Sequence, residues 1–156
     1  MNERANSVLV LACGNTLRGD DGVAWRIGET LEQQPFVDGI EVVFTRQLLP
    51  EHTAQLSVAG VAIFVDCSAV TEPGVVSTIV LSPAPSLPRI FTHHLDPASL
   101  LRLTLELYGR IPSRALAITV GGQSFALDDK LSEPVAAAIP VAAEAVRLAV
   151  IGEVAR

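Results

Sequence analysis

Apolar residues in this chain form short continuous runs, and between the runs apolar positions recur every three or four residues. The runs predict β-strands over residues 7–13, 40–44, 61–65, 75–81 and 115–120. Strands covered on both faces need not alternate in polarity, so continuous runs favour a sheet enclosed by helices. Gly14 and Asn15 follow the first run and are typical of a turn.

The segments between the runs predict helices. Val23, Ile27 and Leu31 lie four residues apart with charged residues between them, as expected for a helix that covers a sheet. Further helices are predicted over residues 51–59, 97–109 and 132–150. The helix after Asp96 has the clearest beginning, because Asp is a favoured N-cap residue and Pro97 suits the first helical position.

The alternation of strands and helices predicts the α/β class. We expect three layers, with helices on both faces of a twisted, mostly parallel sheet of about five strands, one of them antiparallel. Residues 71–74 are too short for a parallel crossover, so the strands at 61–65 and 75–81 are expected to pair as an antiparallel hairpin. Pro140 is expected to kink the last helix. The 156 residues are expected to form a single domain, with residues 1–6 as a flexible tail.

Composition and charge narrow the class of protein. A hydrophobic fraction of 49% with 18% charged residues excludes a disordered chain, and the net charge of -6 disfavours a nucleic-acid partner. No apolar run approaches the roughly 20 residues that cross a bilayer, and the N-terminus lacks a secretory pattern. We therefore expect a cytoplasmic protein with no membrane partner. Cys13 and Cys67 lack the spacing of a zinc site, and both are expected to be reduced.

An acidic loop follows the first predicted strand. Its glycines, Gly14 and Gly19, have the spacing of a phosphate-binding loop, but Asp20 and Asp21 stand where such a loop has Lys and Ser or Thr. Two carboxylates repel phosphate and suit a cation, and the carboxyl ends of strands are where open α/β sheets bind ligands. The alternative is that one of the two aspartates only caps the helix that follows.

Two further segments carry groups that suit a metal. Asp66 directly follows the buried run at 61–65, so its carboxylate is expected at the same edge of the sheet as the acidic loop, unless it only bonds local amides in a turn. His93 and His94 lie in a polar loop, and imidazole is a common nitrogen ligand, although a lone surface histidine usually has no such role. Two carboxylates and one imidazole would leave coordination positions open for chemistry. His52, in contrast, is expected at the surface.

These motifs resemble those of the hydrogenase maturation proteases. The resemblance rests on the strand at 8–13 that leads into Gly-Asn-Thr-Leu-Arg-Gly-Asp-Asp-Gly at 14–22, on Ile-Phe-Val-Asp at 63–66, and on the histidine segment at 92–101 that runs into a leucine-rich helix. It spans about residues 8–150. It implies an endopeptidase that removes the C-terminal extension from the nickel-loaded large-subunit precursor of a nickel-iron hydrogenase. That precursor is the implied partner, and it would supply the nickel that the protease recognises.

The resemblance also implies roles for individual residues. Asp21, Asp66 and His93 would contact the metal and carry the catalysis, with His94 as the competing histidine. The supporting loop would consist of Gly14, Asn15, Asp20 and Gly22. The motifs hold no serine or cysteine nucleophile with a base, which favours metal-assisted attack by water. Two other functions stay open: a non-catalytic module that checks the same precursor for nickel, and a flavodoxin-like domain that binds a small ligand.

Overall fold

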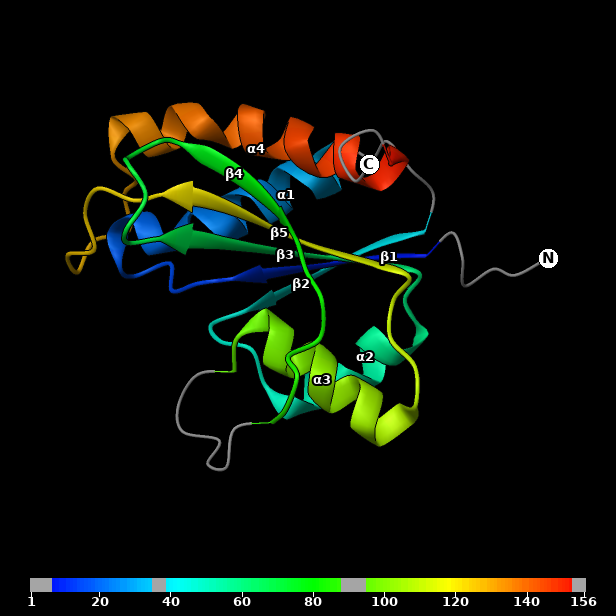
Figure 1. Cartoon of the computed structure of the whole chain (residues 1–156). Helices are drawn as coiled ribbons and strands as arrows, with labels where there is room; N and C mark the ends of the chain where they lie inside the picture. The colour runs from blue at the N-terminus through cyan, green and yellow to red at the C-terminus, as the bar shows by residue number, and fades with distance from the viewer. Residues whose placement is uncertain (1–6, 35–38, 88–94, 153–156) are drawn as a thin grey trace.

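The computed structural model describes residues 7–34, 39–87 and 95–152, which form three layers around a central sheet (Figure 1). The predicted tail, residues 1–6, lies outside the described residues. The strands are β1 (Val8–Cys13), β2 (Ile40–Thr45), β3 (Val61–Ser68), β4 (Val76–Val80) and β5 (Arg114–Gly121). They form one five-stranded sheet in the order β2-β1-β3-β5-β4, in which only β4 is antiparallel to its neighbour. The predicted α/β class with a mostly parallel sheet is confirmed.

Helices cover both faces of the sheet. They are α1 (Val23–Gln33), α2 (Thr53–Val58), α3 (Pro97–Tyr108) and α4 (Glu133–Ile151), with short 3-10 turns η2 (Gly19–Gly22) and η3 (Pro50–His52). One face carries α1 and α4, and the other carries α2 and α3 (Figure 1). In β1, Val10 and Ala12 pack with the first pair, whereas Leu9 and Leu11 pack with the second. This burial on both sides explains why the strand sequence does not alternate in polarity.

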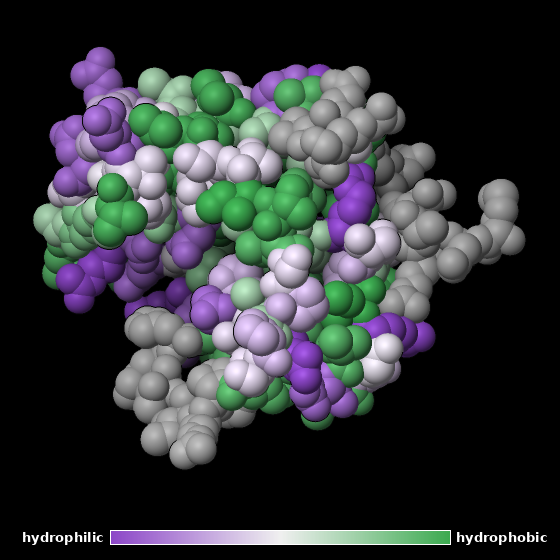
Figure 2. Space-filling model, in the orientation of Figure 1, coloured by the Kyte–Doolittle hydropathy of each residue, from purple (hydrophilic) through white to green (hydrophobic). Residues whose placement is uncertain are grey.

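The antiparallel strand has a different partner from the one predicted. β4 pairs with β5, with Val76 opposite Val120, and β5 lies between β3 and β4. The turn at residues 71–74 reverses the chain, but it does not form a hairpin ladder with β3. The physical reason is burial: β5 is almost wholly buried and belongs in the middle of the sheet, whereas Ile79 and Val80 of β4 are 56% and 63% exposed and suit an edge. Figure 2 shows apolar side chains gathered over this edge.

The helix α3 begins as predicted. The Asp96 side chain accepts a hydrogen bond of 2.7 Å from the amide of Ser99, and Pro97 is the first helical residue. Gly109 ends the helix with a φ of 69°, a left-handed conformation that glycine adopts without strain. The leucines of this helix, at positions 100, 101, 103, 105 and 107, predict a buried side along its whole length. The last turn departs from this prediction, because Leu107 is 61% exposed.

The helix α4 is a covering helix of the domain. It runs as one helix of 19 residues through Pro140. In the described part of the chain, α4 is the one helix long and apolar enough to cross a membrane, and its most apolar window has a mean hydropathy of 1.7. The sequence pattern predicts no such segment. However, Val135, Ala142 and Val146 are fully buried in the core, and they hold α4 against the sheet.

Candidate functional site

Two of the predicted aspartates meet at a cleft beside the carboxyl ends of β1 and β3. The cleft has a volume of about 400 Å³, and its charged lining residues are Asp21, Arg46, Asp66 and Asp96. Parallel strands that end at one edge bring residues from distant parts of the sequence together there. The acidic loop and the end of β3 therefore share one hollow, as the sequence predicted for Asp21 and Asp66.

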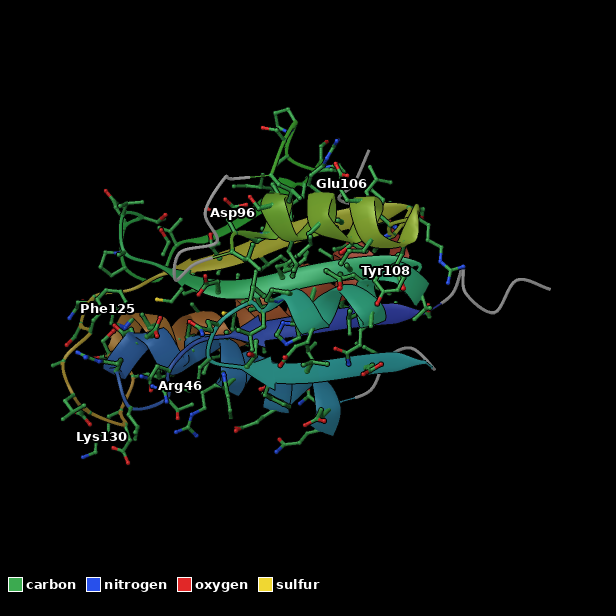
Figure 3. The ribbon with its side chains drawn as sticks, turned by 90° about the horizontal axis from the view of Figure 1, so that it is seen from below. Arg46, Asp96, Glu106, Tyr108, Phe125 and Lys130 are labelled. Carbon is green, nitrogen blue, oxygen red and sulfur yellow. The ribbon has the colours of Figure 1, made fainter. Side chains whose placement is uncertain are left out.

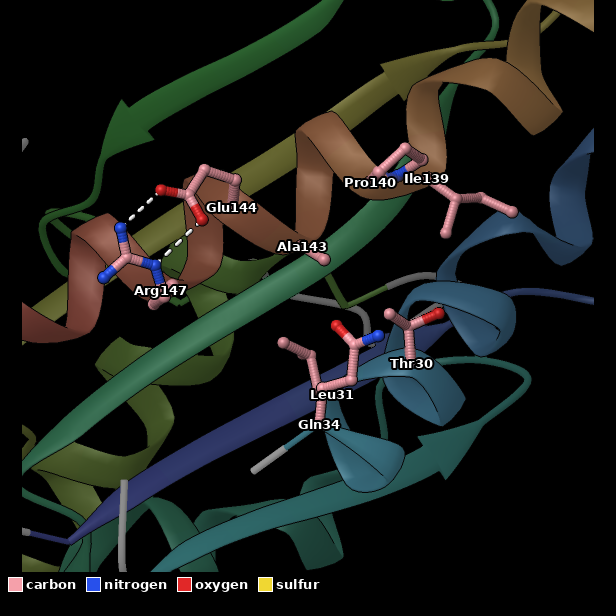
Figure 4. A pocket seen from close by; sticks show the side chains of 8 residues that line it. All are labelled: Thr30, Leu31, Gln34, Ile139, Pro140, Ala143, Glu144 and Arg147. Atoms are coloured by element: carbon pink, nitrogen blue, oxygen red, sulfur yellow. Dashed lines mark hydrogen bonds and ion pairs between the residues drawn. The ribbon is translucent and has the colours of Figure 1, made fainter. Parts of the chain in front are cut away.

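A larger hollow of about 480 Å³ lies between α1 and α4 (Figure 4). Its charged groups, Glu144 and Arg147, lie one turn apart on α4 and form an ion pair with each other. The C-terminal half of α1 lines this hollow, whereas the carboxyl ends of the strands lie near the beginning of α1. We assign the chemistry to the smaller cleft because it holds the acidic groups.

The direction of each strand side chain decides what reaches the cleft. β3 does not end at Asp66 but continues to Ser68, with Asp66 opposite Thr119 of β5. Side chains alternate along a strand, so Asp66 shares the α2 and α3 face with Phe64, and Cys67 faces α1 and α4. Cys13 of β1 also packs on the α2 and α3 face. Cys13 therefore lies on the same face as Asp66, and the two cysteines lie on opposite faces of the sheet.

The surroundings of Asp66 change its pKa strongly. Burial among the cleft walls raises its pKa to about 6, and the negative charge of Asp21 raises it as well. The amide of Cys67 opposes this change by donating a hydrogen bond of 2.7 Å to Oδ1. Much of the surface of Asp66 is nevertheless accessible to solvent, because the cleft walls surround the carboxyl group without covering it. Asp21 is therefore close enough to Asp66 for its charge to oppose the ionisation of Asp66, and the two carboxylates form an acidic pair.

Asp21 is held by its own loop. It lies on η2, and its Oδ2 accepts a hydrogen bond of 2.8 Å from the amide of Asn15. The loop closes so tightly that a Cβ added to Gly14 would lie 2.0 Å from the carbonyl oxygen of Asp21. A Cβ on Gly22 would lie 3.0 Å from the Cα of Thr16. Side chains at either glycine would thus alter the loop that carries Asp21.

Asp20 faces the opposite way and is fully buried. Its Oδ2 accepts hydrogen bonds from the amides of Gln123 at 2.8 Å and Ser124 at 2.9 Å, and from the hydroxyl of Ser132 at 2.7 Å. Its Oδ1 accepts a fourth, of 2.7 Å, from the amide of Ser132. Burial acts to raise the pKa of Asp20, but these donors outweigh it and the pKa is lowered. Asp20 is therefore an ionised anchor inside the protein.

The histidine part of the predicted site is untested. His93 and His94 lie outside the described residues, and the description resumes at Leu95, which lines the cleft. Within residues 7–34, 39–87 and 95–152, no three His, Cys, Asp or Glu side chains lie close enough to hold a metal ion. The prediction that His52 is at the surface is wrong, because the residue is buried. Its Nδ1 accepts a hydrogen bond from the amide of Leu49, and this bond stabilises the turn η3.

Both cysteines are free, and both residues line the cleft, although the side chain of Cys67 packs on the α1 and α4 face of the sheet. Burial raises the pKa of each to about 12, and the charges of Asp66 and Asp21 add to the effect. Both thiols are therefore protonated at neutral pH. Their reduced state stays a prediction.

Sequence reasoning missed Arg46 and gave Asp96 only a capping role. Both line the cleft, and in Figure 3 they lie towards the end of the sheet to which the parallel strands run, whereas Tyr108 lies towards the other end. Arg46 directly follows β2. The rule that identified Asp66, a polar residue at the carboxyl end of a strand, could therefore have found it.

Replacing Asp66 with asparagine is expected to stabilise the metal-free protein near neutral pH. The folded-state pKa of about 6 lies above the ordinary 3.8, so the folded state gains stability from a protonated Asp66 below pH 3.8 and loses it as the pH rises through 6. Solvent screening reduces the effect to about 1 kcal/mol. The asparagine side chain would keep an oxygen that accepts from the amide of Cys67, so Tm at pH 7.5 should rise by about 2–4 °C.

The measurement is thermal unfolding by circular dichroism at pH 7.5 and pH 3.5, with a chelator present. The difference between variant and wild type should disappear at the lower pH. An equal difference at both values would show that the effect is not one of ionisation.

The fold and the cleft together define an α/β protein with an acidic site at the carboxyl edge of a mixed sheet. Solved structures with a similar fold include hydrogenase maturation endopeptidases. The endopeptidase HybD from E. coli has 25% identity and a TM-score of 0.74, and the match covers 94% of each chain. A hydrogenase 2 maturation peptidase from a Thaumarchaeota archaeon has 25% identity and a TM-score of 0.67, covering 94% of this chain and 99% of that one.

A third similar structure, an endopeptidase from Escherichia coli, has 27% identity and a TM-score of 0.68, covering 94% of this chain and 93% of that one. The sequence matches no protein-family model and no curated protein. The structural comparisons nevertheless confirm the resemblance to hydrogenase maturation proteases over most of the chain.

Proposed function

We propose that this protein is an endopeptidase that removes the C-terminal extension from the nickel-loaded large-subunit precursor of a nickel-iron hydrogenase. The observation that supports it most strongly is the pairing of Asp21 and Asp66 in one cleft, on the fold of known maturation endopeptidases. The structural similarity supports peptidase activity in hydrogenase maturation. We further propose that cleavage depends on nickel and that it removes the C-terminal extension.

The chemistry of the cleft suits a cation carried by the substrate. Asp21 and Asp66 are close enough for the charge of one to hinder ionisation of the other, and a positive ion beside them would offset this repulsion. In the proposal both carboxylates contact the nickel that the precursor already holds. His93 supplies the imidazole, with His94 as the alternative.

The nickel ion would act as a Lewis acid beside the scissile peptide bond, which is the chemistry a bound metal supplies to peptide hydrolysis. The residues of this chain bind and orient: Asp21 and Asp66 hold the nickel-bearing end of the precursor so that the bond to be cut lies in the cleft. Oxygen ligands from the enzyme leave the remaining positions of the ion to the groups of the precursor. In the proposed reaction water would add to the carbonyl carbon and the C–N bond would break, so that the precursor ends in a new carboxylate and the extension leaves with an amine that takes up the proton.

The test is the mass of the precursor before and after incubation with this protein. The nickel-loaded precursor should lose the mass of its C-terminal extension, and the nickel-free precursor should keep it. A stable complex without a change in mass would refute the endopeptidase and support a non-catalytic nickel-checking module instead. Cleavage of both precursors at equal rates would refute the role of nickel.

A further inference from the structure

The carboxylate of Asp20 accepts hydrogen bonds only from a distant part of the chain. Its four donors, the amides of Gln123, Ser124 and Ser132 and the hydroxyl of Ser132, lie 103 to 112 positions further along the sequence. The side chain is fully buried, and its two oxygens have no other partner among the described residues. Hydrogen bonds to an ionised group are about twice as strong as neutral ones, so this is a firm connection between two loops.

Backbone bonds continue the same connection. The amide of Asp20 donates to the carbonyl oxygen of Ser124 at 2.9 Å, and the amide of Gly19 donates to that of Asp128 at 2.7 Å. The amide of Asp128 in turn donates to the carbonyl oxygen of Leu17 at 3.1 Å. The loop after β1 and the loop between β5 and α4 are therefore joined along most of their length.

Asp21 directly follows this anchor within the same 3-10 turn. One carboxylate points into the protein and the next lines the cleft, so the orientation of η2 sets the position of Asp21. We propose that Asp20 is a positioning residue, which fixes the Asp21 carboxylate in the cleft by holding η2 against residues 121–132. The inference rests on the proposed role of Asp21.

The chemistry of the anchor requires an acid. All four groups donate to Asp20 and none accepts from it, so the amide nitrogen of an asparagine would face a donor whichever way it turned. Asp20→Asn is expected to lower the rate of precursor processing by about 30-fold, within the range typical of residues that orient a metal-contacting group. The amide of Asn15, which donates to Asp21 Oδ2, should exchange its hydrogen at least about tenfold faster, because the loop opens more often.

A gentler pair of variants covers the case in which Asp20→Asn does not fold. Ser132→Ala removes one donor to Asp20, and Ser132→Thr retains the hydroxyl. The side chain of Ser132 makes no capping hydrogen bond to α4, so loss of a helix cap does not confound the comparison. Ser132→Ala should slow processing about threefold and speed Asn15 exchange, and Ser132→Thr should restore both.

The control for general destabilisation is Val146→Ala in α4, which opens the buried core far from the cleft. This variant should lower Tm and leave both the processing rate and Asn15 exchange unchanged. The inference is overturned if Val146→Ala slows processing as much as Asp20→Asn does, or if Asn15 exchange is unchanged in both Asp20→Asn and Ser132→Ala. If the wild-type protein cleaves no precursor, the proposed function fails, while the exchange of Asn15 still decides whether Asp20 positions Asp21.

Discussion

Replacing Asp21 with asparagine is expected to lower the rate of precursor processing by more than about 100-fold, with little change in Tm. Removing a residue that only orients a metal-contacting group costs about 10- to 100-fold, and the loss of a contacting carboxylate should cost more. The fold should survive because an asparagine oxygen can still accept the hydrogen bond from Asn15. The rate is measured from the mass of nickel-loaded precursor at successive times.

The matched control is Asp129→Asn, the same chemical change on an exposed residue of the loop after β5, outside the cleft. It should process the precursor at the wild-type rate. Normal processing by Asp21→Asn would remove this carboxylate from the reaction and defeat the proposed site.

Gly14→Ala is expected to disrupt the site by steric conflict. The new Cβ would lie 2.0 Å from the carbonyl oxygen of Asp21, which is backbone and cannot rotate away, so the loop must move. Overpacking of this kind costs about 2–3 kcal/mol, and displacing a reacting group by about 1 Å can cost about 100-fold in rate. Thermal unfolding and precursor processing measure the two effects.

Gly109→Ala is the control, because it replaces a glycine with alanine at a position where the added Cβ meets no other atom. Gly109 ends α3 with a φ of 69°, and nothing lies within 4 Å of a Cβ placed there. The free energy of unfolding of Gly109→Ala should fall by about 1–2 kcal/mol because of backbone strain, and its processing rate should not change. If Gly14→Ala behaved in the same way, close packing against Asp21 would have no bearing on the reaction.

Local signals in the sequence were sufficient where structure depends on near neighbours. Asp96 and Pro97 define the start of α3, and Gly109 its end, because capping needs only residues within one turn. The meeting of Asp21 and Asp66 also followed from a local rule, that parallel strands end at a common edge.

Other features depend on contacts that no local pattern records. Asp20 and Asp21 are chemically identical neighbours, and only a loop more than 100 positions later makes one an anchor and leaves the other in the cleft. The pairing of β4 with β5 rather than β3 is equally non-local. His52 is buried because its imidazole bonds the amide of Leu49, which composition alone did not indicate.

The long sequence separation between Asp20 and Ser132 has a consequence for how the protein is made. During synthesis, β1 and the acidic loop leave the ribosome well before residues 121–132, so Asp20 begins without the donors that hold it. Long-range contacts of this kind close late, because the chain must first lose the entropy of the large intervening loop. If Asp20 positions Asp21 as proposed, the nascent chain can form its first strands before Asp21 is fixed in the cleft, and processing activity would begin only once the stretch leading into α4 has docked.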